Sequence, residues 1–164
     1  MLLNFLNLKI SNFLLQIISI LAKTEKGYLY SPLEEKFINF NPKYGQGELS
    51  DNPISLIYIE EDYKLNETSI IVRLSLDNNK TFKFNTENKY LEVDEKDNNL
   101  KYKIKFIDAA NKKGNFQLFT ENGVGCLSAN YVNPFYKIGC RNTPENIWNI
   151  IYEDEVEDFL DSIK

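Results

Sequence analysis

The chain between residues 27 and 153 consists of short apolar stretches that are separated by Asn, Asp, Gly and Pro. Aromatic and β-branched residues are frequent in these stretches, and several alternate with polar residues. Such alternation places every second side chain on the same face of a strand, and these residue types favour strands. The pattern therefore predicts an all-β domain of many short strands, either a barrel or a sandwich.

A helical period occurs near the C-terminal end, where apolar residues recur at spacings of three and four with acidic residues between them. This pattern predicts a short helix in residues 155–164 whose apolar side docks on the β domain. A helix that binds a partner protein is the alternative. The apolar residues are Val156, Phe159, Leu160 and Ile163.

Three segments of the β region share one order of apolar and polar residues. Each begins with apolar residues at i and i+2, continues through a polar turn, and reaches a second apolar pair eight to ten residues later. We expect three copies of a strand–turn–strand unit packed about a pseudo-threefold axis. A β-sandwich with chance similarity between its hairpins is the alternative. The first pairs are Tyr28 and Tyr30, Phe82 and Phe84, and Phe116 and Leu118; the second are Phe37-Ile38, Tyr90-Leu91 and Cys126-Leu127.

The predicted copies cover about residues 27–62, 81–110 and 115–153. The first copy is irregular, because residues 69–76 indicate an additional strand before the second copy begins. A further apolar strand closes each copy, over residues 56–60, 104–108 and 148–153.

Residues 1–22 differ from the rest of the chain, because they contain one charged side chain, Lys9, and an apolar run over residues 13–22. As a helix this run would span ~15 Å, about half of a membrane's hydrocarbon core, so we expect no stable membrane span. Its length is typical of the hydrophobic region of a secretory signal. We interpret residues 1–22 as a signal peptide that is cleaved near Ala22, which leaves a secreted domain over residues 23–154. An uncleaved anchor and an ordinary buried helix are the alternatives.

Secretion would bring the two cysteines of the chain into an oxidising compartment, where they would pair as a disulfide. A bond between Cys126 and Cys140 would contribute ~3 kcal/mol to stability by restricting the unfolded chain. The alternative is a pair of buried free thiols in a cytosolic protein.

The composition excludes several classes of function. The chain contains no histidine, so we expect neither histidine-based catalysis nor a histidine-ligated metal. The 24 acidic residues exceed the 19 basic ones, which argues against nucleic acid as a partner. No carboxylate pair is singled out by its spacing as a glycosidase acid and base, and residues 77–81 lack the Gly and Glu of a calcium loop. We therefore expect no enzyme, no cofactor and no metal.

The third copy contains the sequence GCLSANYVNPFYKIGCRNTPENIWNI, over residues 125–150. It resembles the repeat of the ricin-B-type lectins, which has a Cys-Leu pair, a second Cys, and then Gln-x-Trp. Here Cys126-Leu127, Cys140 and Asn146-Ile147-Trp148 stand in that order, with Asn in place of Gln. The resemblance is clearest over residues 115–152 and faint over residues 27–110. It implies a β-trefoil fold, a disulfide within the repeat, and a core position for Trp148.

The resemblance also implies a surface site for carbohydrate, built from a carboxylate, an aromatic face and an amide. In the third copy the carboxylate position is Ser128, the aromatic candidate is Tyr136, and Glu145 and Asn146 stand where the family has Asn-Gln. In the second copy we predict Glu92 and Tyr102 as the acid and its stacking partner, whereas the first copy has Asn39. No copy retains the full set.

The sequence therefore predicts a secreted, non-catalytic lectin that binds glycans or glycoproteins on a cell or wall surface. The alternative is a trefoil module for protein–protein interaction, or an inhibitor, that has lost sugar binding.

Overall fold

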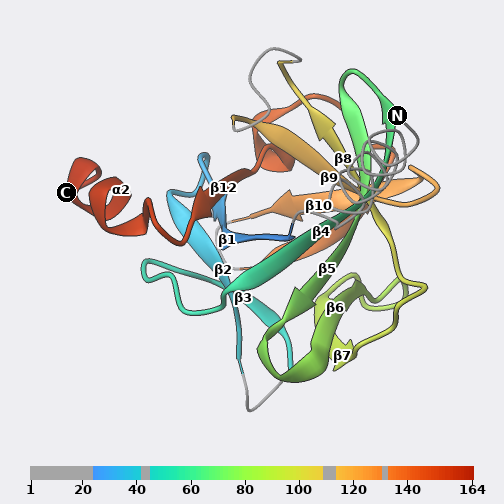
Figure 1. Ribbon diagram of the computed structural model, residues 1–164, viewed down its shortest axis with the longest axis horizontal. Helices are drawn as coiled ribbons and strands as arrows, with labels where there is room; N and C mark the ends of the chain where they lie inside the picture. The colour runs from blue at the N-terminus through green and yellow to red at the C-terminus, as the bar shows by residue number, and fades with distance from the viewer. Residues whose placement is uncertain (1–23, 42–44, 109–113, 131–132) are drawn as a thin grey trace, which may run out of the picture.

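The computed structural model describes residues 24–41, 45–108, 114–130 and 133–164 (Figure 1). Within these residues, twelve antiparallel strands form a nearly closed, barrel-like sheet, and a short helix follows them. The prediction of an all-β domain with a C-terminal helix is confirmed. The predicted signal peptide, residues 1–22, lies outside the described residues.

Six of the strands pair side by side in a ring. Consecutive pairs are β1–β4, β4–β5, β5–β8 and β8–β9, and β12 pairs with β1. An antiparallel bridge between Phe116 and Trp148 joins β9 to the start of β12, with two backbone N–H···O bonds of 2.9 Å. This bridge brings the ring close to full closure. The ring strands are β1 (Thr24–Ser31), β4 (Ile57–Asn66), β5 (Ser69–Leu76), β8 (Tyr102–Phe106), β9 (Phe116–Thr120) and β12 (Asn149–Tyr152).

The other six strands form three hairpins. The isolated bridges Gln46–Glu92 and Tyr90–Phe135 connect neighbouring hairpins, so that the three lie together at one end of the ring. Two short 3-10 turns, η1 (Asp77–Asn79) and η2 (Pro144–Asn146), precede β6 and β12. The hairpins are β2 (Lys36–Phe40) with β3 (Gly47–Ser50), β6 (Lys80–Phe84) with β7 (Leu91–Glu95), and β10 (Gly125–Ala129) with β11 (Pro134–Ile138).

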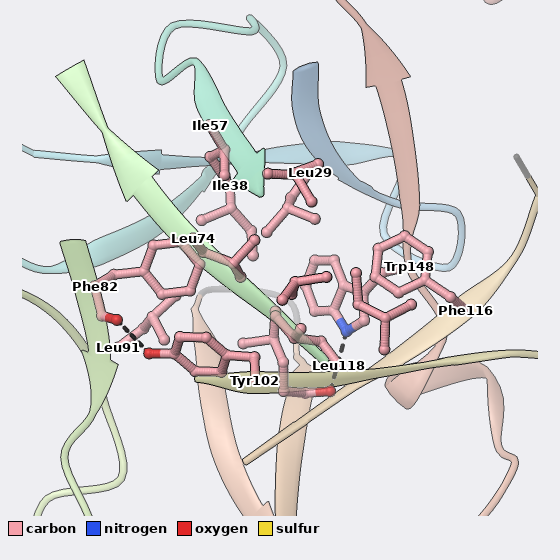
Figure 2. Close-up of a cluster of buried hydrophobic side chains, with 14 of the residues drawn as sticks. Leu29, Ile38, Ile57, Leu74, Phe82, Leu91, Tyr102, Phe116, Leu118 and Trp148 are labelled. Atoms are coloured by element: carbon pink, nitrogen blue, oxygen red, sulfur yellow. Dashed lines mark hydrogen bonds between the residues drawn. The ribbon is translucent and has the colours of Figure 1, made fainter. Parts of the chain in front are cut away.

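Apolar side chains from the ring and the hairpins meet in one core (Figure 2). Two of its largest side chains also carry polar atoms, and both atoms bond to backbone carbonyls of hairpin strands. Trp148 Nε1 donates to the Leu127 carbonyl at 3.0 Å, and the Tyr102 hydroxyl donates to the Phe82 carbonyl. These bonds anchor the hairpins to the ring and satisfy polar groups that would otherwise be costly to bury.

The strand pairing corrects one part of the repeat prediction. The sequence pattern equates Phe82 and Phe84 with Tyr28 and Tyr30. In the structure Phe82 and Phe84 lie on the hairpin strand β6, whereas Tyr28 and Tyr30 lie on the ring strand β1. The segment that we predicted as an additional strand is β5, a ring strand that pairs with β4 and β8. Alternating apolar residues mark any strand with one buried face, so the pattern located the strands but not their partners.

The C-terminal helix α2 (Val156–Ser162) packs on the outside of the barrel. Phe159 contacts Tyr30 edge to face, with ring centroids 4.9 Å apart, and lies 6.0 Å from Phe37. The predicted docking of the helix is therefore confirmed. No helix within the described residues is long and apolar enough to span a membrane.

Candidate functional site

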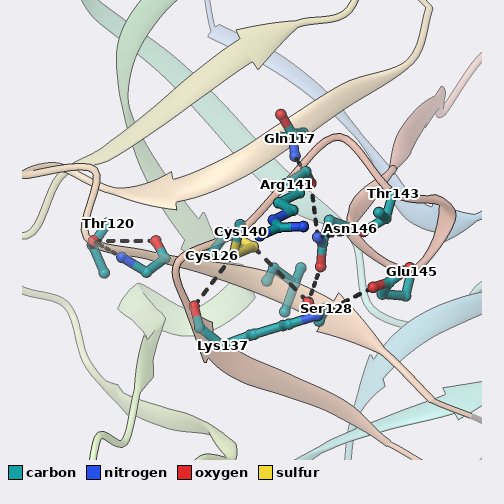
Figure 3. Close-up of a disulfide and its surroundings, with 12 residues drawn as sticks. Gln117, Thr120, Cys126, Ser128, Lys137, Cys140, Arg141, Thr143, Glu145 and Asn146 are labelled. Carbon is teal, nitrogen blue, oxygen red and sulfur yellow. Dashed lines mark hydrogen bonds and ion pairs between the residues drawn. A yellow bond between two sulfur atoms is a disulfide. The ribbon is translucent and has the colours of Figure 1, made fainter.

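The predicted disulfide between Cys126 and Cys140 is present, with 6.1 Å between the two Cα atoms (Figure 3). Cys126 is buried on β10, and Cys140 follows β11. The bond therefore fastens the segment that leads from β11 into η2, and with it the residues of the predicted third sugar site. A structural disulfide fits an oxidising compartment.

Two residues of the predicted third site are used inside the protein. Ser128 and Asn146 are both fully buried, and the Ser128 hydroxyl donates to Asn146 Oδ1. Asn146 Nδ2 donates to the Arg141 carbonyl at 2.9 Å and to Thr143 Oγ1 at 3.0 Å. We call Ser128, Arg141, Thr143 and Asn146 the third-unit network, after the third predicted copy, residues 115–153, in which they lie. The side chains of Ser128 and Asn146 are buried and hydrogen-bonded within this network, so they have no polar group to offer a sugar.

Tyr136 is also an interior residue, with 7% of its surface exposed. Its ring packs at 5.2 Å from the Phe84 ring, and Lys89 Nζ lies 5.5 Å from its centroid. Gly125 makes this packing possible, because a Cβ at that residue would lie 2.0 Å from the tyrosine ring. The ring therefore joins two hairpins and presents no open face for stacking on a sugar.

Glu145 is the predicted residue of this group that reaches the surface. Its carboxylate accepts a hydrogen bond from Lys137 Nζ at 3.1 Å. Hydrogen bonds from its own backbone N–H, from the Thr143 hydroxyl and from Lys137 lower the pKa of the Glu145 carboxyl. The carboxylate is thus present at neutral pH, but it already forms an ion pair.

The predicted second site does not assemble. Tyr102 is 1% exposed, and burial raises the pKa of its hydroxyl. Its assignment as a stacking residue is corrected, because its ring is part of the core. Glu92 lies on β7, where it accepts bonds from the amides of Asn88 and Asn85 at 2.9 and 3.0 Å. These two bonds lower the pKa of the Glu92 carboxyl.

The first-copy candidate, Asn39, has a structural role. It is almost fully buried, and its Oδ1 accepts backbone N–H bonds from Ile54 at 2.9 Å and Ser55 at 3.0 Å. Its Nδ2 donates to the Asn52 carbonyl at 2.7 Å. Asn39 therefore shapes the loop that leads into β4.

That loop forms one wall of a cavity of about 390 Å³, which we call the η1 cavity. The size is within the range of small-molecule pockets. None of its lining residues was predicted as a site residue, because they come from four separate segments and form no motif. Residues 77–81 lack the calcium-loop pattern, and no other sequence feature marks them as part of a ligand pocket. The lining residues are Phe40, Asn41, Gly45, Ile54, Ser55, Leu56, Leu76, Asp77, Lys80 and Val93.

Among the described residues, no group of three His, Cys, Asp or Glu side chains is placed to hold a metal ion. No protein-family model matches the chain, and no curated protein matches it significantly.

Proposed function

We propose that the ring and the three hairpins form a β-trefoil with units over residues 24–66, 69–106 and 116–152. One pair of residues that face each other on neighbouring ring strands supports this arrangement in each unit. A buried leucine stands two positions after the first residue of each pair. The pairs are Gly27 with Ile57, Val72 with Tyr102, and Phe116 with Trp148, and the leucines are Leu29, Leu74 and Leu118.

The hairpins support the same threefold relation. Gly47, Leu91 and Pro134 begin the second strand of each hairpin, and a Cβ at Gly47 would lie 3.1 Å from Pro134 and 3.3 Å from Leu91. The three positions therefore lie around a common point. Their partners in the first strands are Phe40, Phe84 and Ala129.

Within this fold we propose a secreted, non-catalytic carbohydrate-binding protein. The observation that carries the proposal is the third unit, where the Cys126–Cys140 bond and the buried Trp148 occupy the places that the ricin-B-type resemblance implies. Secretion with removal of residues 1–22 is part of the proposal, and the disulfide supports it.

The experiment is a glycan array together with titration of galactosides and N-acetylated sugars against the folded, oxidised protein. We expect at least one sugar to bind in the millimolar range or tighter. A blank array and flat titrations, with the protein folded by circular dichroism, would rule out the lectin function.

The second candidate is a trefoil module for protein–protein interaction. The third-unit network favours it, because Ser128 and Asn146 hydrogen-bond to each other and Asn146 also donates to the backbone, rather than to a ligand. Crosslinking of the immobilised protein to extracellular proteins, with competition by free protein, tests this candidate. The absence of any competable partner would count against it.

A further inference from the structure

The η1 cavity lies between the first two units and outside the positions that the family resemblance predicts. Its walls are the β2–β3 hairpin, the segment before β4, the turn η1 and strand β7. These elements belong to the β-sheet framework and to loops that Asn39 holds by three hydrogen bonds. Strand pairing and the Asn39 hydrogen bonds therefore hold the walls of the cavity in place.

One side of the cavity is apolar. Phe40 forms part of this wall and is held by a stacked contact with Phe82, whose ring centroid is 5.0 Å away. Ile54 lines the cavity with 72% of its surface exposed, the largest exposed fraction among the large exposed apolar side chains of the described residues. An apolar side chain in this position gains free energy when a ligand covers it. Leu56, Leu76 and Val93 complete the wall.

The other side is polar and has unused hydrogen-bonding capacity. Asp77 accepts a hydrogen bond from the Tyr58 hydroxyl, which leaves most of its lone pairs open. Ser55 Oγ accepts the backbone N–H of Phe40 at 2.8 Å and keeps its own proton to donate. The Lys80 ammonium forms no ion pair with a described residue. In contrast to the third-unit network, this cavity combines an acceptor and two donors beside an apolar wall.

We propose that the η1 cavity is the carbohydrate site and holds one pyranose ring. Asp77 accepts hydrogen bonds from adjacent hydroxyls, and Lys80 and Ser55 donate to ring or hydroxyl oxygens. The C–H face of the ring packs on the exposed Ile54 and the partly exposed Leu56. This assignment rests on the proposed lectin function and gives it a location.

A purely ionic ligand fits the cavity less well. Asp77 and Lys80 are exposed, and exposed ion pairs are worth only about 0–1 kcal/mol. A zwitterion would use the two charges but leave the apolar wall uncovered. A pyranose uses both sides, because it carries hydroxyls around a ring that has an apolar face.

The experiment measures binding of galactose, N-acetylgalactosamine, N-acetylglucosamine and mannose to the full oxidised protein by calorimetry and saturation-transfer NMR. We expect Asp77→Asn to weaken binding of the recognised sugar by roughly ten- to hundredfold, the effect of losing hydrogen bonds to a charged group. Ile54→Ala should weaken it by about three- to tenfold through lost apolar contact. A zwitterionic dipeptide serves as the competing ligand class.

Glu145→Gln is the matched control, because it removes one carboxylate from the site that the sequence predicts. It should leave sugar affinity unchanged, and all variants should keep the wild-type melting temperature. Sugar binding that survives Asp77→Asn and Ile54→Ala would overturn the cavity assignment while the lectin function stands. If the wild type binds none of the sugars, here or on the array, both the lectin function and the assignment fall. Binding of the dipeptide without sugar binding would likewise overturn the assignment.

Discussion

In the third-unit network, Ser128 and Asn146 are fully buried and bonded to each other, whereas at the η1 cavity Asp77 and Lys80 are exposed beside an apolar wall. Both regions contain polar residues next to hydrophobic ones. In the first, the polar groups hold a disulfide-linked loop in place. In the second, they have capacity left for a ligand. The comparison teaches that the residues which match a family motif can serve the fold while another surface is free to bind.

We expect the largest effect from Ser128→Asp, which introduces the carboxylate that the ricin-B-type repeat has at this position. Ser128→Asp would place a charge in a fully buried position that faces Asn146 Oδ1. Because an uncompensated buried charge costs several kcal/mol, we expect a loss of about 3–5 kcal/mol in the free energy of unfolding. Urea unfolding monitored by tryptophan fluorescence measures it. A stable variant that gains sugar binding would show that the third unit still holds an open site.

Removal of the disulfide tests how far the segment around the third-unit network depends on the Cys126–Cys140 bond. We expect the double variant Cys126→Ala/Cys140→Ala to lose ~3 kcal/mol of stability. Thermal unfolding with and without reductant measures this loss. The control is that reductant lowers the melting temperature of the wild type and leaves the variant unchanged. Equal sensitivity of the two proteins would contradict the prediction.

Acid unfolding tests the contribution to stability of two carboxyl groups that were predicted as sugar contacts. The pKa values of Glu92 and Glu145 are lowered in the folded protein, so their contribution to stability is present above the unfolded pKa. It is lost as the pH falls through the folded values, below about pH 4. We expect Glu92→Gln/Glu145→Gln to lose less stability than the wild type between about pH 6 and pH 3. Urea titrations at several pH values check this, and parallel pH curves would refute it.

The smallest stability effect is expected at the η1 cavity. Asp77 and Lys80 are exposed, so Asp77→Asn and Lys80→Gln should each change the free energy of unfolding by less than about 0.5 kcal/mol. Chemical denaturation measures it, with Ser128→Asp as the contrasting variant. A loss comparable to that variant would mean that these residues serve the fold, as Ser128 and Asn146 do.

Much of the fold was predictable, because it depends on local patterns. Residue types that favour strands predict the all-β class, and apolar residues at helical spacing predict α2. A chain with two cysteines allows a single disulfide pairing. The partners of the strands were not predictable in the same way, since Phe82 and Phe84 have the spacing of any strand with a buried face. Pairing is decided by contacts between residues that lie far apart in the chain.

The candidate site was harder to predict, for a physical reason. A motif gives residue types at given spacings, but it does not give the solvent exposure of Tyr102 or the partner of Ser128. The η1 cavity brings together Ile54, Asp77 and Val93 from three different segments. Their proximity exists only after these segments have packed together, so no local pattern identifies it.

The pairing of β1 with β12 has a consequence for the synthesis of the chain. Tyr152 donates a hydrogen bond to Glu25 across a sequence separation of 127 residues, and the strands around them close the ring. During synthesis, which starts at the N-terminus, β1 can pair early with β2 and β4. The edge of β1 that pairs with β12 stays unpaired until β12 has been synthesised. Open edges invite pairing between nascent chains, and such distant contacts form slowly. The last step of folding is therefore the one at which we expect this protein to depend most on chaperones.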